Sequence, residues 1–458
     1  MSKGMIEKLA EAPSVAIEET ITLSETIVVK VKDQKPLKKA KGYWHMLGPG
    51  LTTGAADDDP SGIATYSQTG AQSGFRFLWL AGFTFPLMAV IQEMCARIGY
   101  VTGRGLASNI RLHFPKKILY LTTILLIIAN TFNIGADLGA MAKSVQLIYP
   151  DAHFGISLLL ISILCLTLQI FMEYRTYAKF LKWLALILLS YIFSTLMIKD
   201  LDWNLILKST LIPSLDLSPD SILLVGAILG TTISPYLFFW QTSQEVEEDI
   251  LMGNTSIKSR QAEVNSEVIH SMRVDVWSGM FFSNLIMFFI ILAAGATLHV
   301  AGITTIGSAQ EAAEALRPLA GDKSFFLFAL GIIGTGMLAV PVLAGSTAYA
   351  LAESLKWKVG LYRKLKDAHA FYGVIIFSML IGFALNFSQI DPIKALFYSA
   401  VANGLIAPVI LTMIVIISSK KAIMGEYVNH PLTTLVGIIA TLVMFVSAGA
   451  SLYIIFLG

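Results

Sequence analysis

The sequence predicts an all-α integral membrane protein, and three observations support that prediction. Of the 458 residues, 55% are hydrophobic and only 14% are charged, whereas soluble globular domains carry roughly a quarter charged residues. The mean hydropathy is +0.69. The apolar residues also fall in long blocks, such as 119–132 and 432–457. With their flanks, these blocks are long enough to cross a hydrocarbon layer of about 30 Å. A soluble protein with buried helices does not need so many blocks of this length.

Eleven transmembrane helices are expected, joined by connections that are short except at 199–218, 245–273 and 299–324. The expected spans are 46–72, 76–99, 117–147, 154–173, 178–198, 219–244, 274–298, 325–352, 371–387, 392–417 and 432–456. The layout is a cytoplasmic N-terminal tail (1–45), a first repeat of five helices (46–198), an external loop (199–218), a second repeat (219–417) and a last helix (432–456).

The basic residues predict the orientation of these helices. With the N-terminus in the cytoplasm, 26 of the 33 Lys and Arg residues fall on the cytoplasmic side. Because cytoplasmic loops of membrane proteins are enriched in Lys and Arg, this split places the N-terminus inside. An odd number of spans then places the C-terminus outside, and we expect a multi-pass protein of the cell (plasma) membrane.

Two prolines interrupt corresponding helices. Pro60 lies within the first span and Pro235 within the sixth, so that five helices separate the starts of the two units. Five is odd, so the units would have opposite orientations, as in transporters built from inverted repeats. The alternative is that the prolines are simple kinks, which are common in membrane helices.

Asp57, Asp58 and Asp59 precede the first of these prolines. If 57–61 were a solvent loop, the flanking segments would be too short to cross a bilayer, which needs about 20 residues. A helix broken near its middle fits better, with its unwound backbone lining a polar cavity. The carboxyl end of a half-helix carries partial negative charge, and an aspartate adds a full one. This combination predicts a cation site.

The candidate metal ligands lie at the two breaks: Asp59, Gly62, Thr231, Ser234 and Ala56, the last and Thr231 at the carbonyl ends of half-helices. Asp59 is the first choice because it sits at the break itself. Asp57 and Asp58 point in directions about 100° apart on a helix, so at most one can share its face. For those two we favour a rim or a partnered structural charge.

Other polar residues within spans are candidates for the hydration shell or the pathway: Asp58, Tyr236, Gln241, Asp137 and Asn403. Intramembrane carboxylates are functional by default. Glu93 has two interpretations, a functional carboxylate or a buried pair with Arg97 one turn away. Asn403 either faces the pathway or, as we favour slightly, hydrogen-bonds between helices.

Two stretches, DPSGIATYSQTGAQSGFRFLW from Asp59 and EMCARIGYVTGRGLA from Glu93, resemble the first two helices of the Nramp family of divalent-metal transporters. The resemblance covers nearly the whole chain and is strongest over 47–107. It implies the five-plus-five inverted repeat of the LeuT type, with helices one and six broken. It also implies that the metal site lies at the Asp-Pro-Gly-Asn motif of helix one and the Met-Pro-His motif of helix six.

The chain departs from the family pattern at informative positions. The family's asparagine falls at Gly62, its methionine at Ser234 and its histidine at Tyr236. In helix three, the acidic residues of the family's proton route fall at Asn133 and Ala136, with Asp137 adjacent. A thioether selects soft metals, whereas oxygen ligands suit Mg²⁺, Ca²⁺ or Mn²⁺. The chain therefore looks most similar to the Nramp-related magnesium transporters.

These observations predict a secondary transporter that takes up divalent cations by alternating access: Mg²⁺ and also Mn²⁺, partly hydrated, and not proton-coupled. The alternative is a proton-coupled Mn²⁺/Fe²⁺ symporter of the ordinary Nramp type. A membrane sensor would be expected to carry a large regulatory domain, and an organic-substrate transporter does not explain three clustered acids.

Enzymatic function is not expected. Cys95 and Cys165 fall in separate spans, the seven histidines are scattered without metal-ligand spacing, and no phosphate-binding loop is found. We therefore expect no cofactor and no nucleotide or nucleic-acid partner. The expected partners are a divalent metal ion as substrate and the lipid bilayer.

Overall fold

The computed structural model describes residues 48–172, 188–199, 201–214, 216–388 and 390–457. Within these ranges all regular elements are helices and no strand is present, in agreement with the predicted all-α class. The predicted tail 1–45 and residues 178–187 of the fifth predicted span, 178–198, lie outside the described residues.

The first half of the described chain contains the helices α3 (Pro49–Asp57), α4 (Pro60–Ser73), α5 (Trp79–Thr102), α6 (Leu106–His113), α7 (Lys116–Ile148), α8 (Phe154–Phe171), α10 (Leu189–Met197) and α11 (Trp203–Leu211).

The second half contains α12 (Pro219–Thr232), α13 (Pro235–Leu251), α14 (Ile257–Ala262), α15 (Ser266–Ala294), which continues as a π-helical turn (Gly295–His299), α16 (Ala309–Ala313), α17 (Arg317–Ala320), α18 (Ser324–Ser354), α19 (His369–Leu385), α20 (Pro392–Ser419), α21 (Lys421–Met424) and α22 (Pro431–Leu457).

Prolines mark the start of many of these helices. α3, α4, α12, α13, α20 and α22 all begin at a proline. Proline lacks the amide that the first helical turn leaves unpaired, and its fixed φ suits that position. A proline in the sequence therefore indicates where such a helix begins. For α20, the predicted span starts at 392 and the helix begins at Pro392.

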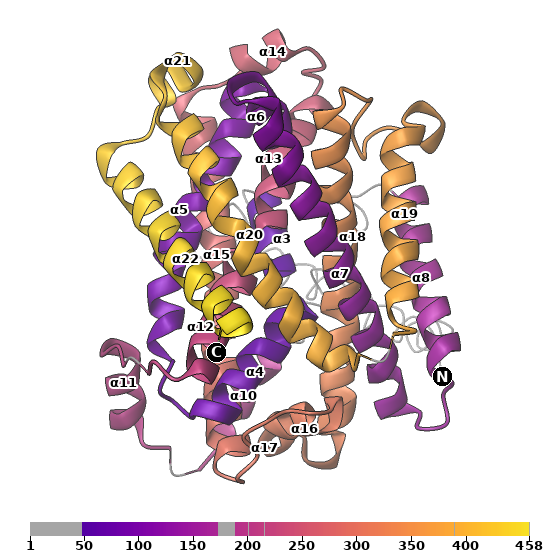
Figure 1. The fold of residues 1–458 in the computed structure, drawn as a ribbon, viewed down its shortest axis with the longest axis vertical. Helices are drawn as coiled ribbons and strands as arrows, with labels where there is room; N and C mark the ends of the chain where they lie inside the picture. The colour runs from indigo at the N-terminus through magenta and orange to yellow at the C-terminus, as the bar shows by residue number, and fades with distance from the viewer. Residues whose placement is uncertain (1–47, 173–187, 200, 215, 389, 458) are drawn as a thin grey trace, which may run out of the picture. The chain divides into compact units, whose positions relative to one another are not determined.

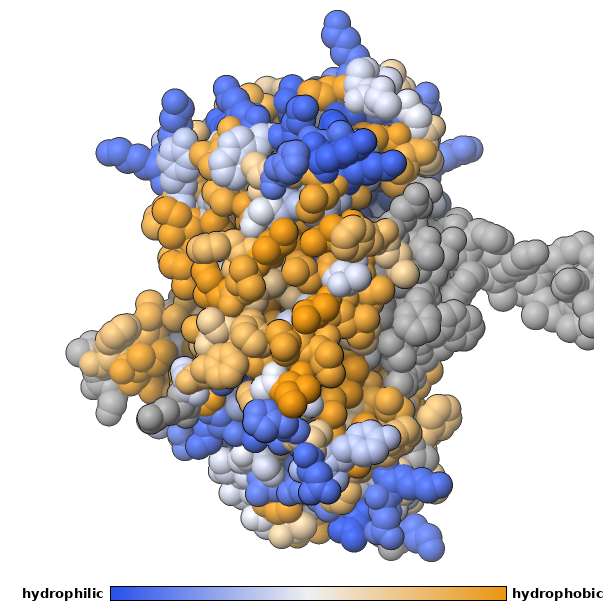
Figure 2. Space-filling model, turned by 90° about the vertical axis from the view of Figure 1, so that its right-hand side faces the viewer, coloured by the Kyte–Doolittle hydropathy of each residue, from blue (hydrophilic) through white to orange (hydrophobic). Residues whose placement is uncertain are grey.

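Eight helices among the described residues are long and apolar enough to cross a membrane. α19 is a shorter apolar helix. On the face drawn in Figure 2, hydrophobic residues form a broad band between two hydrophilic ends. A band of this kind is expected where lipid tails contact the protein. The described helices thus have the lengths and the surface of a multi-pass membrane protein.

Figure 1 shows α6, α14 and α21 at one end of the bundle and α11, α16 and α17 at the other, with the long helices α7, α18 and α20 running between them. We call these the α6/α14 end and the α11/α17 end. α3 lies on the α6/α14 side of its break and packs on α15, whereas α4 continues toward the α11/α17 end.

Small residues allow two close helix contacts beside the breaks. A Cβ added at Gly54 of α3 would lie 2.3 Å from the carbonyl oxygen of Gly279 on α15. A Cβ added at Gly230 of α12 would lie 2.0 Å from the carbonyl oxygen of Ala400 on α20. Glycine lets helix backbones approach this closely in membranes, where packing drives association. These contacts hold α3 against α15 and α12 against α20.

Candidate metal site

Asp59 lies between α3 and α4, outside both helices, and caps the first turn of α4. Its Oδ1 accepts hydrogen bonds from the Gly62 amide (2.7 Å) and the Ser61 hydroxyl (2.6 Å). The sequence dictates this arrangement, because Asp is a good N-cap residue and Pro60 disfavours helical conformation in the residue before it. Only 1% of the Asp59 surface is exposed. The break therefore holds a buried carboxylate in a fixed position.

The other oxygen of Asp59 contacts α7. Oδ2 accepts a hydrogen bond from Asn133 Nδ2 (3.1 Å), and Asn133 Oδ1 accepts one from the Ser399 hydroxyl of α20 (2.7 Å). No ion pair in the described part of the chain joins Asp59 to a basic side chain. Burial penalises the charge of a carboxylate that has only neutral donors, and a bound cation would offset that penalty. Such a group is suited to bind a cation.

The second break lies between α12 and α13, at Ile233 and Ser234. The Ser234 hydroxyl donates hydrogen bonds to the carbonyl oxygens of Gly230 (2.8 Å) and Thr231 (2.6 Å). The Tyr236 hydroxyl donates to the carbonyl oxygen of Ala56, near the end of α3 (3.0 Å). Hydroxyl groups of α13 thus contact the carbonyl ends of both α12 and α3.

The two breaks face each other. The hydroxyls of Ser61 and Thr231 lie 3.4 Å apart. Gly62 lies between the breaks: a Cβ added there would be 3.2 Å from the Asp57 carbonyl oxygen and 3.4 Å from Thr231 Oγ1. The structure therefore brings together all five predicted ligands, Asp59, Gly62, Thr231, Ser234 and Ala56.

The oxygen atoms at the two breaks come from few acidic side chains. Among the described residues no group of three or more His, Cys, Asp or Glu side chains is placed to hold a metal ion. One carboxylate, hydroxyls and backbone carbonyls are the available oxygens. Oxygen donors of these kinds suit hard cations.

Comparison with known proteins agrees with this architecture. Residues 50–454 match the family described as natural resistance-associated macrophage protein-like, or Nramp. The chain belongs to the Nramp family.

Relatives of this Nramp chain cover nearly all of its length. It is 26% identical over 419 residues to the divalent metal cation transporter MntH of Aeromonas hydrophila, covering 88% of this chain and 94% of the relative. It is 24% identical to the protein of the same name from Caldanaerobacter subterraneus, covering 91% of this chain and 95% of the relative.

Solved structures share its fold. A crystal structure of the Eremococcus coleocola manganese transporter aligns with a TM-score of 0.69 at 17% identity, covering 91% of this chain and 88% of the other. The inward-facing structure of Mhp1 aligns with a TM-score of 0.51 at 14% identity, covering 89% and 91%.

Asp57 and Asp58 of this Nramp chain turn toward α15. Asp57 Oδ2 accepts a hydrogen bond from the Ser283 hydroxyl (2.6 Å), and Asp58 Oδ1 lies 3.4 Å from the same hydroxyl. Asp59 instead contacts α7. Asp57 and Asp58 thus share one hydroxyl donor and lie beside the site, directed away from the contacts of Asp59.

The remaining pathway candidates occupy different positions. Asp137 is buried one helical turn beyond Asn133, and neither carboxylate oxygen has a partner among the described residues. Asn403 is buried one turn beyond Ser399, and its amide atoms likewise have no partner there. Gln241 donates to Glu245 Oε1 in the next turn of α13 (2.6 Å). Asp137 on α7 and Asn403 on α20 therefore each lie one turn from the hydrogen bond between Asn133 and Ser399.

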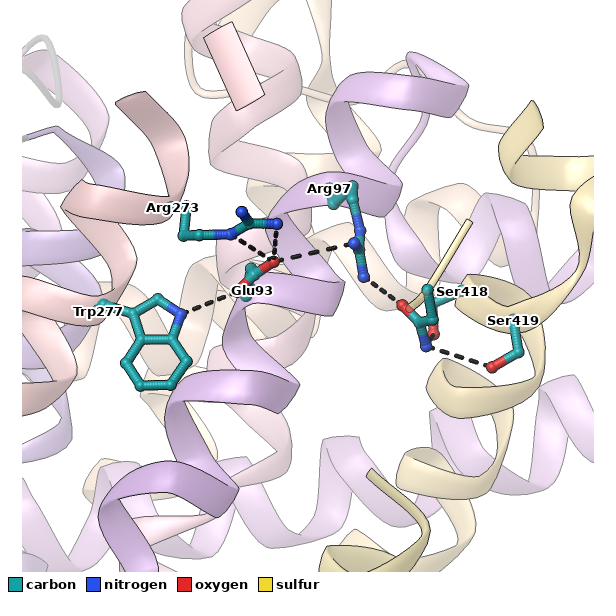
Figure 3. Close-up of polar contacts among 7 residues, drawn as sticks. Glu93, Arg97, Arg273, Trp277, Ser418 and Ser419 are labelled. Atoms are coloured by element: carbon teal, nitrogen blue, oxygen red, sulfur yellow. Dashed lines mark hydrogen bonds and ion pairs between the residues drawn. The ribbon is translucent and has the colours of Figure 1, made fainter. Parts of the chain in front are cut away.

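Glu93 belongs to a separate polar cluster (Figure 3). Its Oε1 accepts from Arg273 Nε (3.0 Å), and its Oε2 accepts from the Trp277 indole (2.8 Å). Arg97, the partner considered from the sequence, is more distant at 3.8 Å and donates to Asn429 as well. Asn429 in turn donates to Ser418 and Ser419. The cluster joins α5, α15 and α20, and these contacts agree with the interpretation of Glu93 as a buried, paired carboxylate.

Sequence reasoning missed three contributors to the site. Ser61 lies within the Asp59 motif, and a serine two residues after an N-cap aspartate can be expected to donate to its carboxylate. Ser283 and Ser399 come from helices far along the chain, and no local pattern marks either residue.

Proposed function

We propose that this protein is a secondary transporter of divalent metal cations, with Asp59 as its charged ligand. The observation that carries the proposal is the buried carboxylate of Asp59, held by neutral donors where two broken helices meet. Broken helices of this kind form ion sites in transporters of inverted-repeat architecture. The names of the relatives, divalent metal cation transporter MntH and manganese transporter, support a metal substrate. The activity is transport, not catalysis, and needs no resident cofactor.

We further propose that Mg²⁺ and Mn²⁺ are the transported ions and that they bind partly hydrated. Ser234 occupies a position where a thioether would favour soft metals, and it supplies a hydroxyl instead. Gly62 adds no side-chain ligand. Mg²⁺ gives up its water reluctantly and commonly keeps several water ligands, so a site with few protein ligands suits it.

Transport without obligatory proton uptake is the third part of the proposal. The side chains that hydrogen-bond to Asp59 are the amide of Asn133 and the hydroxyl of Ser61, neither of which exchanges a proton near neutral pH. The alternative is proton-coupled Mn²⁺/Fe²⁺ symport. One observation favours that alternative: Asp137 is a buried carboxylate without a partner in the described part of the chain.

Alternating access needs an approach to the site from each end, and the bundle has a cavity of about 450 Å³ at either end, one along α4 and one lined by Glu247 at the α6/α14 end. Ala64, Gln68 and Gln72 on successive turns of α4 line the first cavity together with Asp220 and Lys394. At the α6/α14 end, the carboxylate of Glu247 accepts from the amides of Leu361 (2.6 Å) and Tyr362 (3.1 Å).

The positive-inside distribution assigns the α6/α14 end to the cytoplasm of a cell membrane. The N-terminus is then cytoplasmic and the C-terminus external, and the cavity along α4 is an external vestibule that ends one turn from the break.

The proposal is tested by reconstitution of the full-length protein into liposomes. Uptake of Mg²⁺ and Mn²⁺ is measured with metal-sensitive dyes inside the vesicles, and a pH dye is read in parallel. We expect Mn²⁺ uptake that Mg²⁺ inhibits competitively, without acidification that tracks the metal. Absence of any divalent-cation uptake would refute the transport function. Mn²⁺ uptake that millimolar Mg²⁺ does not inhibit would favour the alternative.

A further inference from the structure

Two hydroxyls from the beginning of α13 contact the carbonyl oxygens that the two breaks expose. Ser234 contacts Gly230 and Thr231 at the end of α12, and Tyr236 contacts Ala56 at the end of α3. The last carbonyls of a helix lack partners within the helix. They are therefore the backbone oxygens that a cation at Asp59 would use.

Ser234 does not act as an ordinary helix cap. It precedes Pro235 at the N-cap position of α13, where a serine side chain normally accepts a hydrogen bond from the second or third amide of the helix. Here the side chain makes no such bond. Its hydroxyl is directed back to α12 and donates to the carbonyl oxygens at the end of that half-helix.

Tyr236 makes one hydrogen bond, to Ala56, among the contacts of the described residues. Only 1% of its surface is exposed, so water does not compete freely for its hydroxyl. A buried phenol hydroxyl usually has a hydrogen-bond partner. The partner of Tyr236, on α13, is a carbonyl oxygen of α3. The bond joins the second break to the first.

We infer that Ser234 and Tyr236 determine ion specificity by occupying the carbonyls of Gly230, Thr231 and Ala56, so that a cation at Asp59 retains water in place of backbone ligands. The inference rests on the proposed function of this site. A carbonyl lone pair that accepts a hydrogen bond is a weaker ligand for a cation. An ion that keeps its water loses little by this, whereas an ion that exchanges water for protein ligands loses more.

The first variant is Tyr236→Phe, which keeps the ring and removes the hydroxyl that occupies Ala56. The matched control is Tyr66→Phe. Tyr66 is also buried, but its hydroxyl contacts the side-chain hydroxyl of Thr232 (3.2 Å) rather than a backbone carbonyl. Ser234→Ala, which frees the other two carbonyls, is the second variant.

The first measurement uses Mn²⁺ bound to the purified full-length protein, with its water ligands counted by pulsed electron paramagnetic resonance in deuterated water. We expect fewer bound waters in Tyr236→Phe and Ser234→Ala than in the wild type, and an unchanged number in Tyr66→Phe. An unchanged number in both test variants would overturn the inference.

The second measurement is the ratio of Mn²⁺ to Mg²⁺ affinity in a binding titration. The loss of one competing hydrogen bond should raise this ratio about three- to tenfold in Tyr236→Phe. A ratio equal to that of Tyr66→Phe would contradict the inference even if both proteins bind metal. Thermal melting confirms that each variant is folded. If the wild type binds no divalent cation, the proposed function itself fails, which is a distinct result.

Discussion

The backbone amide of Gly50 donates a 2.7 Å hydrogen bond to Oδ2 of Asp275, so a carboxylate of α15 caps the first turn of α3. The Leu51 amide donates to the other oxygen of the same carboxylate (3.0 Å). A negative charge at a helix N-terminus is stabilising. These bonds hold the half-helix that leads from the α6/α14 end to Asp59.

We predict that Asp275→Asn loosens this attachment. The amide side chain lacks the charge and one acceptor, which should weaken the interaction by about 1 kcal/mol. With a Thr53→Cys substitution on α3 as reporter, labelling by a thiol reagent should become about three- to tenfold faster, following the same energy. The native Cys95 and Cys165 are buried, so they add little background.

The control for this experiment is Asp202→Asn. Asp202 caps α11 in the same manner, with the amides of Asn204 and Leu205 both donating to its Oδ1 at 3.0 Å. Labelling of Thr53→Cys should be unchanged by it. Equal acceleration by both substitutions would show a general loss of stability instead of a local attachment at α3.

Asp59→Asn should abolish metal uptake and leave folding intact. Asparagine is as good an N-cap residue as aspartate, so the start of α4 is kept while the charge is lost. Removal of the one charged ligand from a site of low dielectric should cost several kcal/mol of cation binding. Mn²⁺ binding and uptake, measured beside thermal melting, test the prediction.

Asp391→Asn is the matched control for Asp59→Asn, because Asp391 caps α20 in the same Asp-Pro sequence and accepts from the Ile393 amide (2.9 Å). It should leave uptake near the wild-type level. Wild-type uptake by Asp59→Asn would remove the basis for placing the ion at this break.

Ser234→Met should reverse the metal preference. A thioether adds a soft ligand, so Cd²⁺ binding should strengthen and Mg²⁺ uptake should weaken. Gly62→Asn should act in the same direction, and the two effects should not be additive because both residues surround one ion. The tight fit at Gly62, with contacts of 3.2 to 3.4 Å for an added Cβ, predicts a lower melting temperature for that variant. Competition of Cd²⁺ and Mg²⁺ against Mn²⁺ uptake is the assay.

Proton coupling can be separated from metal binding at Asp137. We expect Mn²⁺ uptake without matching acidification in both the wild type and Asp137→Asn, since Asp137 makes no hydrogen bond to Asp59 or its partners. A pH dye inside the liposomes provides the measurement. Acidification in the wild type that disappears in Asp137→Asn would identify a proton carrier and support the symport alternative.

The orientation of the chain gives a fifth prediction. Cysteines placed in the N-terminal tail should react with an impermeant reagent only from the cytoplasmic side, and cysteines after Phe456 only from outside, because of the distribution of basic residues. Reaction of both positions from one side would contradict an odd number of spans.

Local features of the sequence account for much of the fold. Apolar runs and prolines predict α7 over 117–147, and the structure places it at Lys116–Ile148. The Asp-Pro pair at Asp59 marks the end of one helix and the start of the next, because both residues have strong local preferences. The ligands near this pair could be proposed for the same reason.

Contacts between distant helices could not be read in this way. The sequence suggested Arg97 as the partner of Glu93 because it is one turn away, but Arg273, on α15, lies closer. Ser399 reaches Asp59 through Asn133, and nothing in the spacing of α20 distinguishes it from other serines. Which faces of separate helices meet is decided by packing across the bundle, and periodicity within one helix does not contain that information.

The glycine contact between α3 and α15 has a consequence for how fast α3 can change position. Gly50, Gly54 and Gly279 bring backbone against backbone, with no side chains from these three positions interlocked between the helices. Rotation of α3 on this surface therefore requires little repacking of rotamers. Movement of α3 must still break its hydrogen bonds to other helices, which include those to Asp275, that of Asp57 with Ser283 and that of Ala56 with Tyr236. The temperature dependence of the rate should therefore become shallower in Asp275→Asn.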